Sequence, residues 1–389
     1  MATFKQYTDK KGNNKWKFQV YLGVDYVTGK EIRTTRRGFE TKKKAQKKLN
    51  ELLVEFENKG QLKSNVTLFK EVYELWFKNY ERSVKESTKL MTKKHFEKHI
   101  LPIFGDLKLE RITMKYCQTV VNDWYDSVSM ARLLVSYTSK VFDYAITLEV
   151  MESNPTKHVL RPVQKKKTKR SIKFYTRGQL ERFLAYLDDE ISLAEGDLSR
   201  SYTRELDRTI FRLLAFSGIR VSEALALSWN DFNSEDNTIS ISKTLSQSEK
   251  GYVLSTPKTE RSNRSVLLDE KTAHTLKRWR LKQREMMLAH GKRSIKSIFC
   301  RLDGSYMIRT DVYHRSKKIA SACELPFIGC HGFRHTHASL LFETKQVSLK
   351  HIQHRLGHTD IQITANIYTH ITNEDDKMIV DSLTKHANF

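Results

Sequence analysis

The sequence predicts a multidomain protein that is mainly α-helical, with one small β-sheet near the N-terminus and another in the C-terminal half. Its 389 residues are enough for two or three domains. Strand-like alternation dominates residues 1–65, helical spacing dominates residues 66–160, and residues 176–389 mix helices with short strands. A basic stretch at residues 161–175 has almost no apolar pattern and is interpreted as a linker.

Residues 1–65 predict a small sheet with one helix. One strand face carries Trp16, Phe18, Val20, Leu22 and Val24, and the opposite face carries Lys15, Lys17, Gln19 and Tyr21. A turn over residues 25–30 leads to a second strand near Ile32, and Thr41 is placed to cap a helix that ends before Gly60.

This N-terminal segment is rich in lysine and arginine, and strands can enter the major groove of DNA as a ribbon. We therefore predict a DNA-reading module. Its candidate DNA contacts are Lys15, Lys17, Arg33, Arg36 and Arg37. The alternative is a small basic domain that only packs on the rest of the protein.

Residues 66–160 predict a compact bundle of four or five short helices. The apolar positions of the first helix are Phe69, Val72, Tyr73, Trp76 and Tyr80. Their helical spacing favours a hydrophobic core over a platform on which bases stack. Pro102 and Gly105 interrupt the pattern, and the last helix is expected to end near Asn154.

The linker at residues 161–175 joins two candidate DNA-binding parts. A charge run of this kind is usually a solvated connection, but here we favour a segment that follows the phosphate backbone. Its candidate DNA contacts are Lys165, Lys166, Lys167, Lys169 and Arg170.

Residues 176–389 open with a capping box, Thr176 to Gln179, ahead of an amphipathic helix. Strands are predicted at residues 238–242 and 264–268. They flank a Thr-Pro-Lys-Thr segment that contains Lys258 and suits a turn or a strand end. The rest of this domain is predicted to be helical.

The composition restricts the class of partner. A formal net charge of +24 implies a polyanion, and nucleic acid is favoured because no window is apolar enough to span a bilayer. The N-terminus lacks the apolar core of a signal peptide, so we expect a cytoplasmic protein, which in a bacterium means one beside the nucleoid. The four cysteines have no C-x-x-C spacing, which favours reduced structural thiols.

Arg220 and Glu223 form the first candidate site motif. Gly218 permits a turn before a helix, and Arg220 at the start of that helix would face an anion. Glu223, one turn further on, is placed to orient the guanidinium group or a neighbouring histidine. Alone, such a pair predicts no more than a surface salt bridge.

Four further residues complete the candidate site. His331 and Arg334 stand three apart and share a helix face. His358 follows a Leu-Gly pair, and Tyr368 comes about ten residues later. With Arg220 and Lys258, these types suit work on a phosphate: arginine forks match its oxygens, histidine and lysine move protons, and tyrosine can attack it.

The histidines also admit a rival interpretation as zinc ligands. The positions concerned are His331, His335, His337, His351, His354 and His358. No H-E-x-x-H stands among them, and no cysteine or carboxylate has ligand spacing. We therefore expect no metal and no other cofactor, which agrees with a chemistry that breaks and rejoins a phosphodiester.

This order of motifs resembles the tyrosine recombinases, the lambda-type phage integrase family. The resemblance covers essentially the whole chain and is greatest to integrases of temperate phages and conjugative elements of Gram-positive bacteria. It implies an arm-binding domain at residues 1–65, a helical core-binding domain at residues 66–160 and a catalytic domain at residues 176–389.

The resemblance also implies roles for single residues. Tyr368 would be the nucleophile that forms a 3′-phosphotyrosyl bond, and Lys258 would protonate the leaving oxygen. The residues that match the remaining family positions are Arg220, Glu223, His331, Arg334 and His358. The match of Lys258 competes with Lys250 and Arg261 nearby. A homotetramer on double-stranded DNA, an excisionase and a host DNA-bending protein are the implied partners.

The function that follows is an integrase that inserts and excises a mobile element through a Holliday junction. A Xer-type dimer resolvase is the alternative within the same chemistry, although simple resolvases lack an arm-binding domain. A non-catalytic DNA-binding regulator with the same fold is the alternative from another class. The attachment sites, the host locus and the type of mobile element cannot be inferred from these residues.

Overall fold

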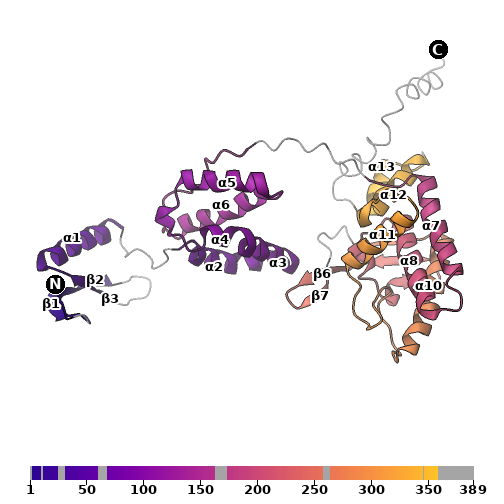
Figure 1. The fold of residues 1–389 in the computed structure, drawn as a ribbon, viewed down its shortest axis with the longest axis horizontal. Helices are drawn as coiled ribbons and strands as arrows, with labels where there is room; N and C mark the ends of the chain where they lie inside the picture. The colour runs from indigo at the N-terminus through magenta and orange to yellow at the C-terminus, as the bar shows by residue number, and fades with distance from the viewer. Residues whose placement is uncertain are drawn as a thin grey trace, which may run out of the picture. The chain divides into compact units, whose positions relative to one another are not determined.

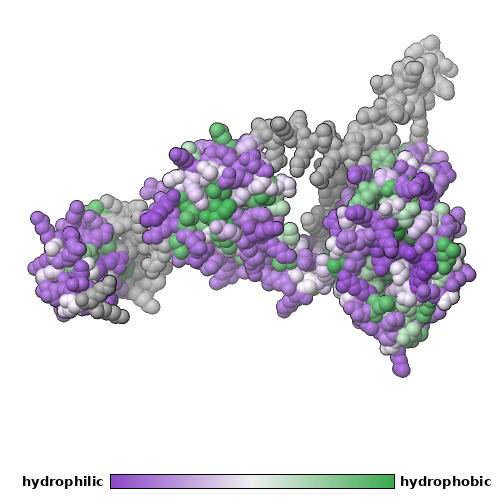
Figure 2. Space-filling model, in the orientation of Figure 1, coloured by the Kyte–Doolittle hydropathy of each residue, from purple (hydrophilic) through white to green (hydrophobic). Residues whose placement is uncertain are grey.

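A computed structural model describes residues 2–9, 12–24, 31–59, 68–162, 173–256, 263–344 and 346–357. In chain order, Figure 1 shows a small sheet with one helix, a helical bundle and a larger mixed domain. The predicted class, mainly α with small antiparallel sheets, is confirmed. Hydrophilic side chains cover most of the face drawn in Figure 2. No helix in the described ranges is long and apolar enough to cross a membrane.

The N-terminal module is a three-stranded antiparallel sheet with one helix. The elements are β1 (Ala2–Thr8), β2 (Asn14–Val24), β3 (Glu31–Phe39) and α1 (Lys42–Lys59), with β2 in the middle of the sheet. The first strand, β1, is not predicted by the sequence, since few of its side chains are apolar. The strand predicted near Ile32 is β3, which extends further than expected, through Arg36 and Arg37 to Phe39.

Alternation along β2 produces the core of this module. Phe18 and Val20 are buried and form one cluster with Ala45 and Leu49 of α1, which confirms the predicted apolar face. The Thr41 hydroxyl accepts a hydrogen bond from the Lys44 N–H at 3.2 Å and so caps α1, as predicted.

The middle domain is the expected helical bundle. Its helices are α2 (Phe69–Tyr80), α3 (Glu86–His95), α4 (Leu101–Phe104), α5 (Met114–Ser127) and α6 (Ala131–Thr147), with a π-helical turn at Phe96–Ile100. The aromatic residues of α2 are core: Phe69 is fully buried, and Tyr73 stacks on Phe96 with ring centroids 4.3 Å apart.

The last helix of the bundle ends earlier than predicted, at Thr147 instead of near Asn154. Glu149 has a positive φ of 58°, which stops the helix. Asn154 then folds back and is buried, because its side-chain amide donates to the Ser139 carbonyl at 3.0 Å and to Asp143 Oδ1 at 2.8 Å.

The C-terminal domain is built around a long central helix. Helix α8 (Leu198–Ser217) packs against α7 (Arg177–Ser192), α10 (Glu270–Ala289) and α12 (Gly329–Glu343). The capping box of α7 is present, since Thr176 N–H donates to Gln179 Oε1 at 3.0 Å and Gln179 N–H donates back at 3.4 Å.

The remaining elements of this domain surround α8. They are α9 (Val221–Ala224), β4 (Phe232–Asn233), β5 (Thr238–Ile241), β6 (Thr244–Ser248), β7 (Gly251–Ser255), β8 (Arg264–Leu267), α11 (Arg309–Ala322) and α13 (Leu349–Leu356). The predicted strands β5 and β8 pair antiparallel. The hairpin of β6 and β7 lies between them in the chain and is not predicted, because its side chains are mostly polar or exposed.

All four cysteines are buried and free, in agreement with structural thiols. Burial raises the pKa of Cys117 to about 12 and that of Cys300 to about 11. These thiols are therefore neutral and unreactive at physiological pH.

Candidate active site

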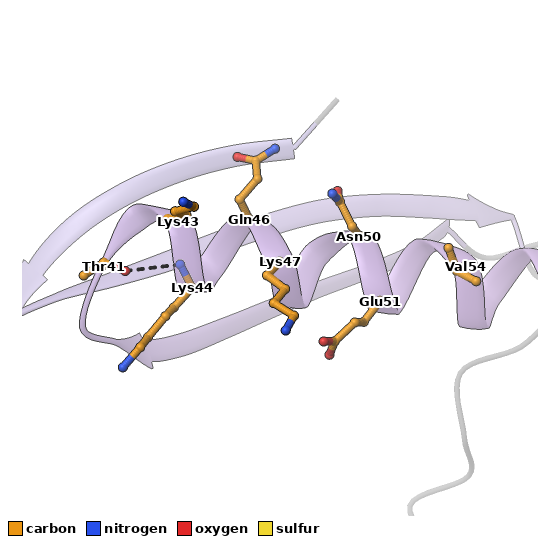
Figure 3. A pocket seen from close by; sticks show the side chains of 8 residues that line it. All are labelled: Thr41, Lys43, Lys44, Gln46, Lys47, Asn50, Glu51 and Val54. Carbon is orange, nitrogen blue, oxygen red and sulfur yellow. Dashed lines mark hydrogen bonds between the residues drawn. The ribbon is translucent and has the colours of Figure 1, made fainter.

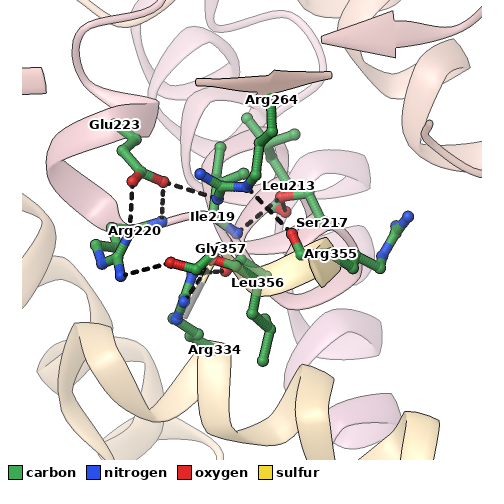
Figure 4. Close-up of polar contacts among 11 residues, drawn as sticks. Leu213, Ser217, Ile219, Arg220, Glu223, Arg264, Arg334, Arg355, Leu356 and Gly357 are labelled. Atoms are coloured by element: carbon green, nitrogen blue, oxygen red, sulfur yellow. Dashed lines mark hydrogen bonds and ion pairs between the residues drawn. The ribbon is translucent and has the colours of Figure 1, made fainter. Parts of the chain in front are cut away.

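Arg334 lies at the centre of the candidate site in the C-terminal domain. Its side chain is 1% exposed and extends from α12 to the ends of two other helices (Figure 4). One terminal nitrogen donates to the Gly218 carbonyl at 2.7 Å, and the other donates to the Leu356 carbonyl at 2.6 Å. Burial, and then repulsion from Arg220, lowers the pKa of Arg334 to about 9, so the group remains a cation at neutral pH.

Both acceptors of Arg334 belong to helix C-termini, where the helix dipole favours a cation. Helix α8 ends at Gly218 with φ of 67°, and α13 ends at Gly357 with φ of 66°. These left-handed glycines stop the helices and leave main-chain carbonyls free to accept. A Cβ atom on Gly218 would lie 2.6 Å from the His337 ring, so no other residue fits this turn without a shift.

Arg220 is the second cation of the site and lies at the start of α9. It is held by Glu223: its N–H donates to Oε2 at 3.0 Å, and its guanidinium donates to Oε1 at 2.8 Å. A further contact reaches the Gly357 carbonyl at 3.4 Å. Its side chain is 38% exposed, so Arg220 faces solvent where Arg334 does not.

Glu223 is the carboxylate that these cations share. A second arginine, Arg264 of β8, donates to Oε2 at 3.0 Å, and both side chains of this pair are about 5% exposed. Burial alone would raise the pKa of Glu223, but Arg264 and then Arg220 lower it below its usual value. Glu223 is therefore ionised and carries two cationic partners.

His331 and His335 lie one turn apart on α12, with ring centroids 4.6 Å apart. Loss of hydration among the crowded side chains is the main cause that lowers the pKa of His331 to about 4, although its outer side is exposed. The charges of His335, Arg334 and Arg220 lower it further. At neutral pH His331 is an uncharged imidazole that can accept a proton.

His337 and Arg355 support the site from behind. His337 is buried, and its Nδ1 lies 2.9 Å from the Ala215 carbonyl, while its Nε2 lies 3.0 Å from the Arg355 Nε–H. Because Arg355 can only donate, the neutral ring must carry its proton on Nδ1. Burial, and then the charge of Arg355, lowers the pKa of His337 to about 3.

The structure brings together four of the seven residues that the sequence singles out: Arg220, Glu223, His331 and Arg334. The other three, Lys258, His358 and Tyr368, lie outside the described residues. The supporting residues that the sequence does not assign to the phosphate site are Arg264, His337 and Arg355. Among the described residues, Glu223 is the carboxylate in hydrogen-bond contact with this group of arginines, so this part of the site has surplus positive charge and suits an anion.

Of the six histidines considered as zinc ligands, His358 lies outside the described residues, and two of the other five have different partners. His337 forms hydrogen bonds with the Ala215 carbonyl and with Arg355, and His351 contacts the Ser348 hydroxyl at 2.8 Å. Within the described ranges, no group of three or more histidine, cysteine, aspartate or glutamate side chains is arranged to hold a metal ion.

Comparison with known proteins shows the family to which this chain belongs. The model of the phage integrase family matches residues 173–375, which is more than half of the chain. The chain belongs to the phage integrase family. Two further models match this integrase: an N-terminal SAM-like domain of phage integrases at residues 68–125 and an arm DNA-binding domain at residues 4–56.

Curated relatives cover nearly the whole integrase. It is 26% identical to the ICEBs1 integrase of Bacillus subtilis, over 95% of this chain and 97% of the relative. It is 28% identical to a XerC-like tyrosine recombinase of Caldanaerobacter subterraneus, over 96% of this chain and 97% of the relative. The protein is thus a tyrosine recombinase, an enzyme of site-specific DNA integration and excision.

Two solved structures show the same fold. The Tn1549 transposon integrase, in complex with a circular intermediate DNA, matches with a TM-score of 0.62 and 19% identity, over 82% of this chain and 99% of that one. A lambda integrase tetramer bound to a Holliday junction matches with a TM-score of 0.55 and 18% identity, over 95% of this chain and 96% of that one.

The arm-domain sheet of this integrase has one strongly basic face. The strand register pairs Lys17 with Lys5 on one side and with Arg37 on the other, and it pairs Tyr21 with Arg33. These residues therefore share the face opposite the buried Phe18. Arg36 pairs with Phe18 and lies on the other face of the sheet, so the five predicted DNA contacts of this domain do not form one surface.

The outer side of α1 is a second basic surface (Figure 3). The residues exposed along it are Thr41, Lys43, Lys44, Gln46, Lys47, Asn50, Glu51 and Val54. These lysines are not predicted as contacts from the sequence, since a helix with one apolar stripe always has a polar side. None of these residues belongs to the arginine site.

Replacing Gly218 with alanine is expected to destabilise the catalytic domain by roughly 2 kcal/mol or more, from left-handed strain together with the clash against His337. Thermal unfolding measures the loss. Gly291→Ala is the matched control, because Gly291 has a similar φ of 73° but no atom within 4 Å of its Cβ position. Equal losses in the two variants would contradict the close approach at Gly218.

Acid is expected to destabilise the protein through its buried imidazoles. An unfolded histidine has a pKa of about 6.5, whereas that of folded His337 is about 3. Between these values the unfolded state binds more protons, so the free energy of unfolding falls as pH drops below about 6.5. Calorimetry from pH 7.5 to 5 should show a smaller pH dependence in His337→Asn. An unchanged slope would exclude His337 as a source.

Proposed function

We propose that Arg220 and Arg334 bind the non-bridging oxygens of one scissile phosphate, which Tyr368 attacks. The buried Arg334 carries this proposal: two of its five N–H groups go to carbonyls, and its Nε has no partner among the described residues. A phosphate oxygen would satisfy the remaining donors. Arg220 offers a second fork from the exposed side, and together the two cations would stabilise the charge of the transition state.

The proposed cleavage exchanges one phosphate ester for another. The Tyr368 hydroxyl oxygen bonds to phosphorus while the bond between phosphorus and the 5′ oxygen breaks, leaving a 3′-phosphotyrosyl bond and a free 5′-hydroxyl. His331 takes the tyrosine proton, and Lys258 gives a proton to the leaving oxygen. His358 binds a phosphate oxygen. The charges of Arg334 and Arg220 act on the His331 ring, which supports its place at the same phosphate.

Rejoining is the same step in reverse, with a 5′-hydroxyl of another strand as the attacking group. The ester energy is kept in the protein–DNA bond, so neither ATP nor a divalent cation takes part. Repeating the step on the second pair of strands resolves a Holliday junction. The lambda integrase tetramer on such a junction, which has this fold, supports the same assembly for this chain.

Each domain has its own DNA contact in this proposal. Residues 1–65 bind arm sites, residues 66–160 bind the core site, residues 176–389 carry out catalysis, and the linker at residues 161–175 lies along the backbone. The three family matches fall within or close to these ranges and support the division. The proposed linker contacts are Lys165, Lys166, Lys167, Lys169 and Arg170, which lie outside the described residues.

The integrase is proposed to act in the bacterial cytoplasm, at the nucleoid. An excisionase and a host DNA-bending protein are the proposed accessory partners, since an arm-binding domain implies that distant sites are brought together on bent DNA. Within this proposal the accessory proteins set the direction of recombination, while the chemistry stays with the integrase.

The chemistry is tested with a nicked, labelled DNA that carries the element's own core site, in the presence of EDTA. Wild type should form a covalent adduct that survives a denaturing gel, and Tyr368→Phe should form none, because it lacks the attacking oxygen. Tyr313→Phe, which removes the hydroxyl of an exposed tyrosine on α11, is the matched control and should retain the adduct. Binding without an adduct in wild type would favour the regulator.

The basic sheet face is tested by binding of the full chain to arm-site DNA at several salt concentrations. Arg37→Ala should weaken binding and reduce the salt dependence by about one counterion, because one phosphate contact is lost. Arg36→Ala, on the other face of the sheet, is the control and should bind like wild type. The assignment of the DNA-facing surface is wrong if the Arg36 variant is the weaker binder.

A further inference from the structure

Glu223 lies between two arginines, one partly exposed and the other buried. Figure 4 shows the guanidinium groups of Arg220 and Arg264 reaching its carboxylate from different sides. The contacts are 2.8 Å from Arg220 and 3.0 Å from Arg264. Arg220 is 38% exposed, whereas the Arg264 side chain is 5% exposed and does not reach the open side of the site.

Arg264 also holds a second segment of the chain. Its Nε donates to the main-chain carbonyl of Arg355 at 3.1 Å, in the last turn of α13. The next carbonyl along that turn, from Leu356, is an acceptor of Arg334. The buried guanidinium of Arg264 thus connects β8 to Glu223 of α9 and to the end of α13. The same end of α13 supplies an acceptor for Arg334.

The charges explain why a buried arginine is needed here. With Arg220 as its single cationic partner, Glu223 would cancel the charge that Arg220 presents to a phosphate. Arg264 supplies a second positive charge from the interior, so the group of Arg220, Glu223 and Arg264 carries a net charge of +1. In the interior such a charge is weakly screened and acts strongly on a nearby anion.

We infer that Arg264 is a positioning residue for strand cleavage. It neutralises Glu223, so that Glu223 does not cancel the charge of Arg220. It also holds the end of α13, so that the Arg220 guanidinium stays directed toward the phosphate. The inference rests on the proposed roles of Arg220 and Arg334. A salt bridge that served the fold alone would have no effect on how the enzyme responds to the charge of its substrate, and this difference can be measured.

The experiment compares single-turnover cleavage of a core site by the full chain at saturating protein. Arg264→Gln is expected to lower the rate on the order of 10²-fold, the loss that a small misplacement of a catalytic group can cause. Glu223→Gln/Arg264→Gln removes both buried charges and is expected to be faster than Arg264→Gln, because Arg220 is no longer neutralised. A double variant that is no faster than the single variant would overturn the inference.

A second substrate separates charge from folding. A methylphosphonate at the scissile position replaces one non-bridging oxygen with a methyl group and removes the negative charge. Arg264→Gln should lose much less activity on this substrate than on the phosphodiester, as should Arg220→Ala. Val266→Ala, a buried substitution in the same strand, should lose the same fraction of its activity on the methylphosphonate as on the phosphodiester. Equal losses for Arg264→Gln would also overturn the inference.

A conservative variant and the wild type distinguish the role of Arg264 from the proposed chemistry. Arg264→Lys retains the cation, and its rate should exceed that of Arg264→Gln even if the glutamine variant is poorly folded. Failure of wild type to form any adduct with the phosphodiester would refute the proposed chemistry itself. An active wild type in which Arg264→Lys is no better than Arg264→Gln would refute the role of Arg264 alone.

Discussion

The hydrogen bonds between the buried guanidinium of Arg334 and two main-chain carbonyls are the constraint on which the site depends. Gly218 and Leu356 supply these carbonyls from the ends of α8 and α13. A buried cation without such partners would be very unfavourable. The ends of α8 and α13 must therefore pack against α12 so that their carbonyls reach Arg334. The same packing places Arg220 and His331 beside Arg334.

The site combines strong positive charge with few anions. Glu223 is shared by Arg220 and Arg264, while Arg334 and Arg355 are held by carbonyls and, for Arg355, by the His337 ring. Carbonyl dipoles hold arginines in place without cancelling their charge. The integrase can thus keep several cations close together in the absence of DNA and offer them to a phosphate.

Spacing along single helices grouped two pairs of residues that the structure also places in this part of the domain. Arg220 and Glu223 are one turn apart, and so are His331 and Arg334, so local periodicity was enough to group each pair. Arg264, His337 and Arg355 escaped prediction because their partners come from distant parts of the chain, as with Arg355 and Phe216. The same holds for the fold: apolar alternation predicted β2, but the polar hairpin of β6 and β7 has no such pattern.

Main-chain acceptors have a consequence for how such a protein can change through mutation. At the end of α13 the side chain of Leu356 is free to vary wherever packing allows, since its carbonyl is present whatever the residue. Gly218 is fixed instead by its left-handed backbone and its close approach to His337. Insertions are a different matter: one extra residue in α13 rotates everything beyond it by about 100°, which would turn the Leu356 carbonyl away from Arg334. At the end of α13, helix length is therefore more constrained than residue identity.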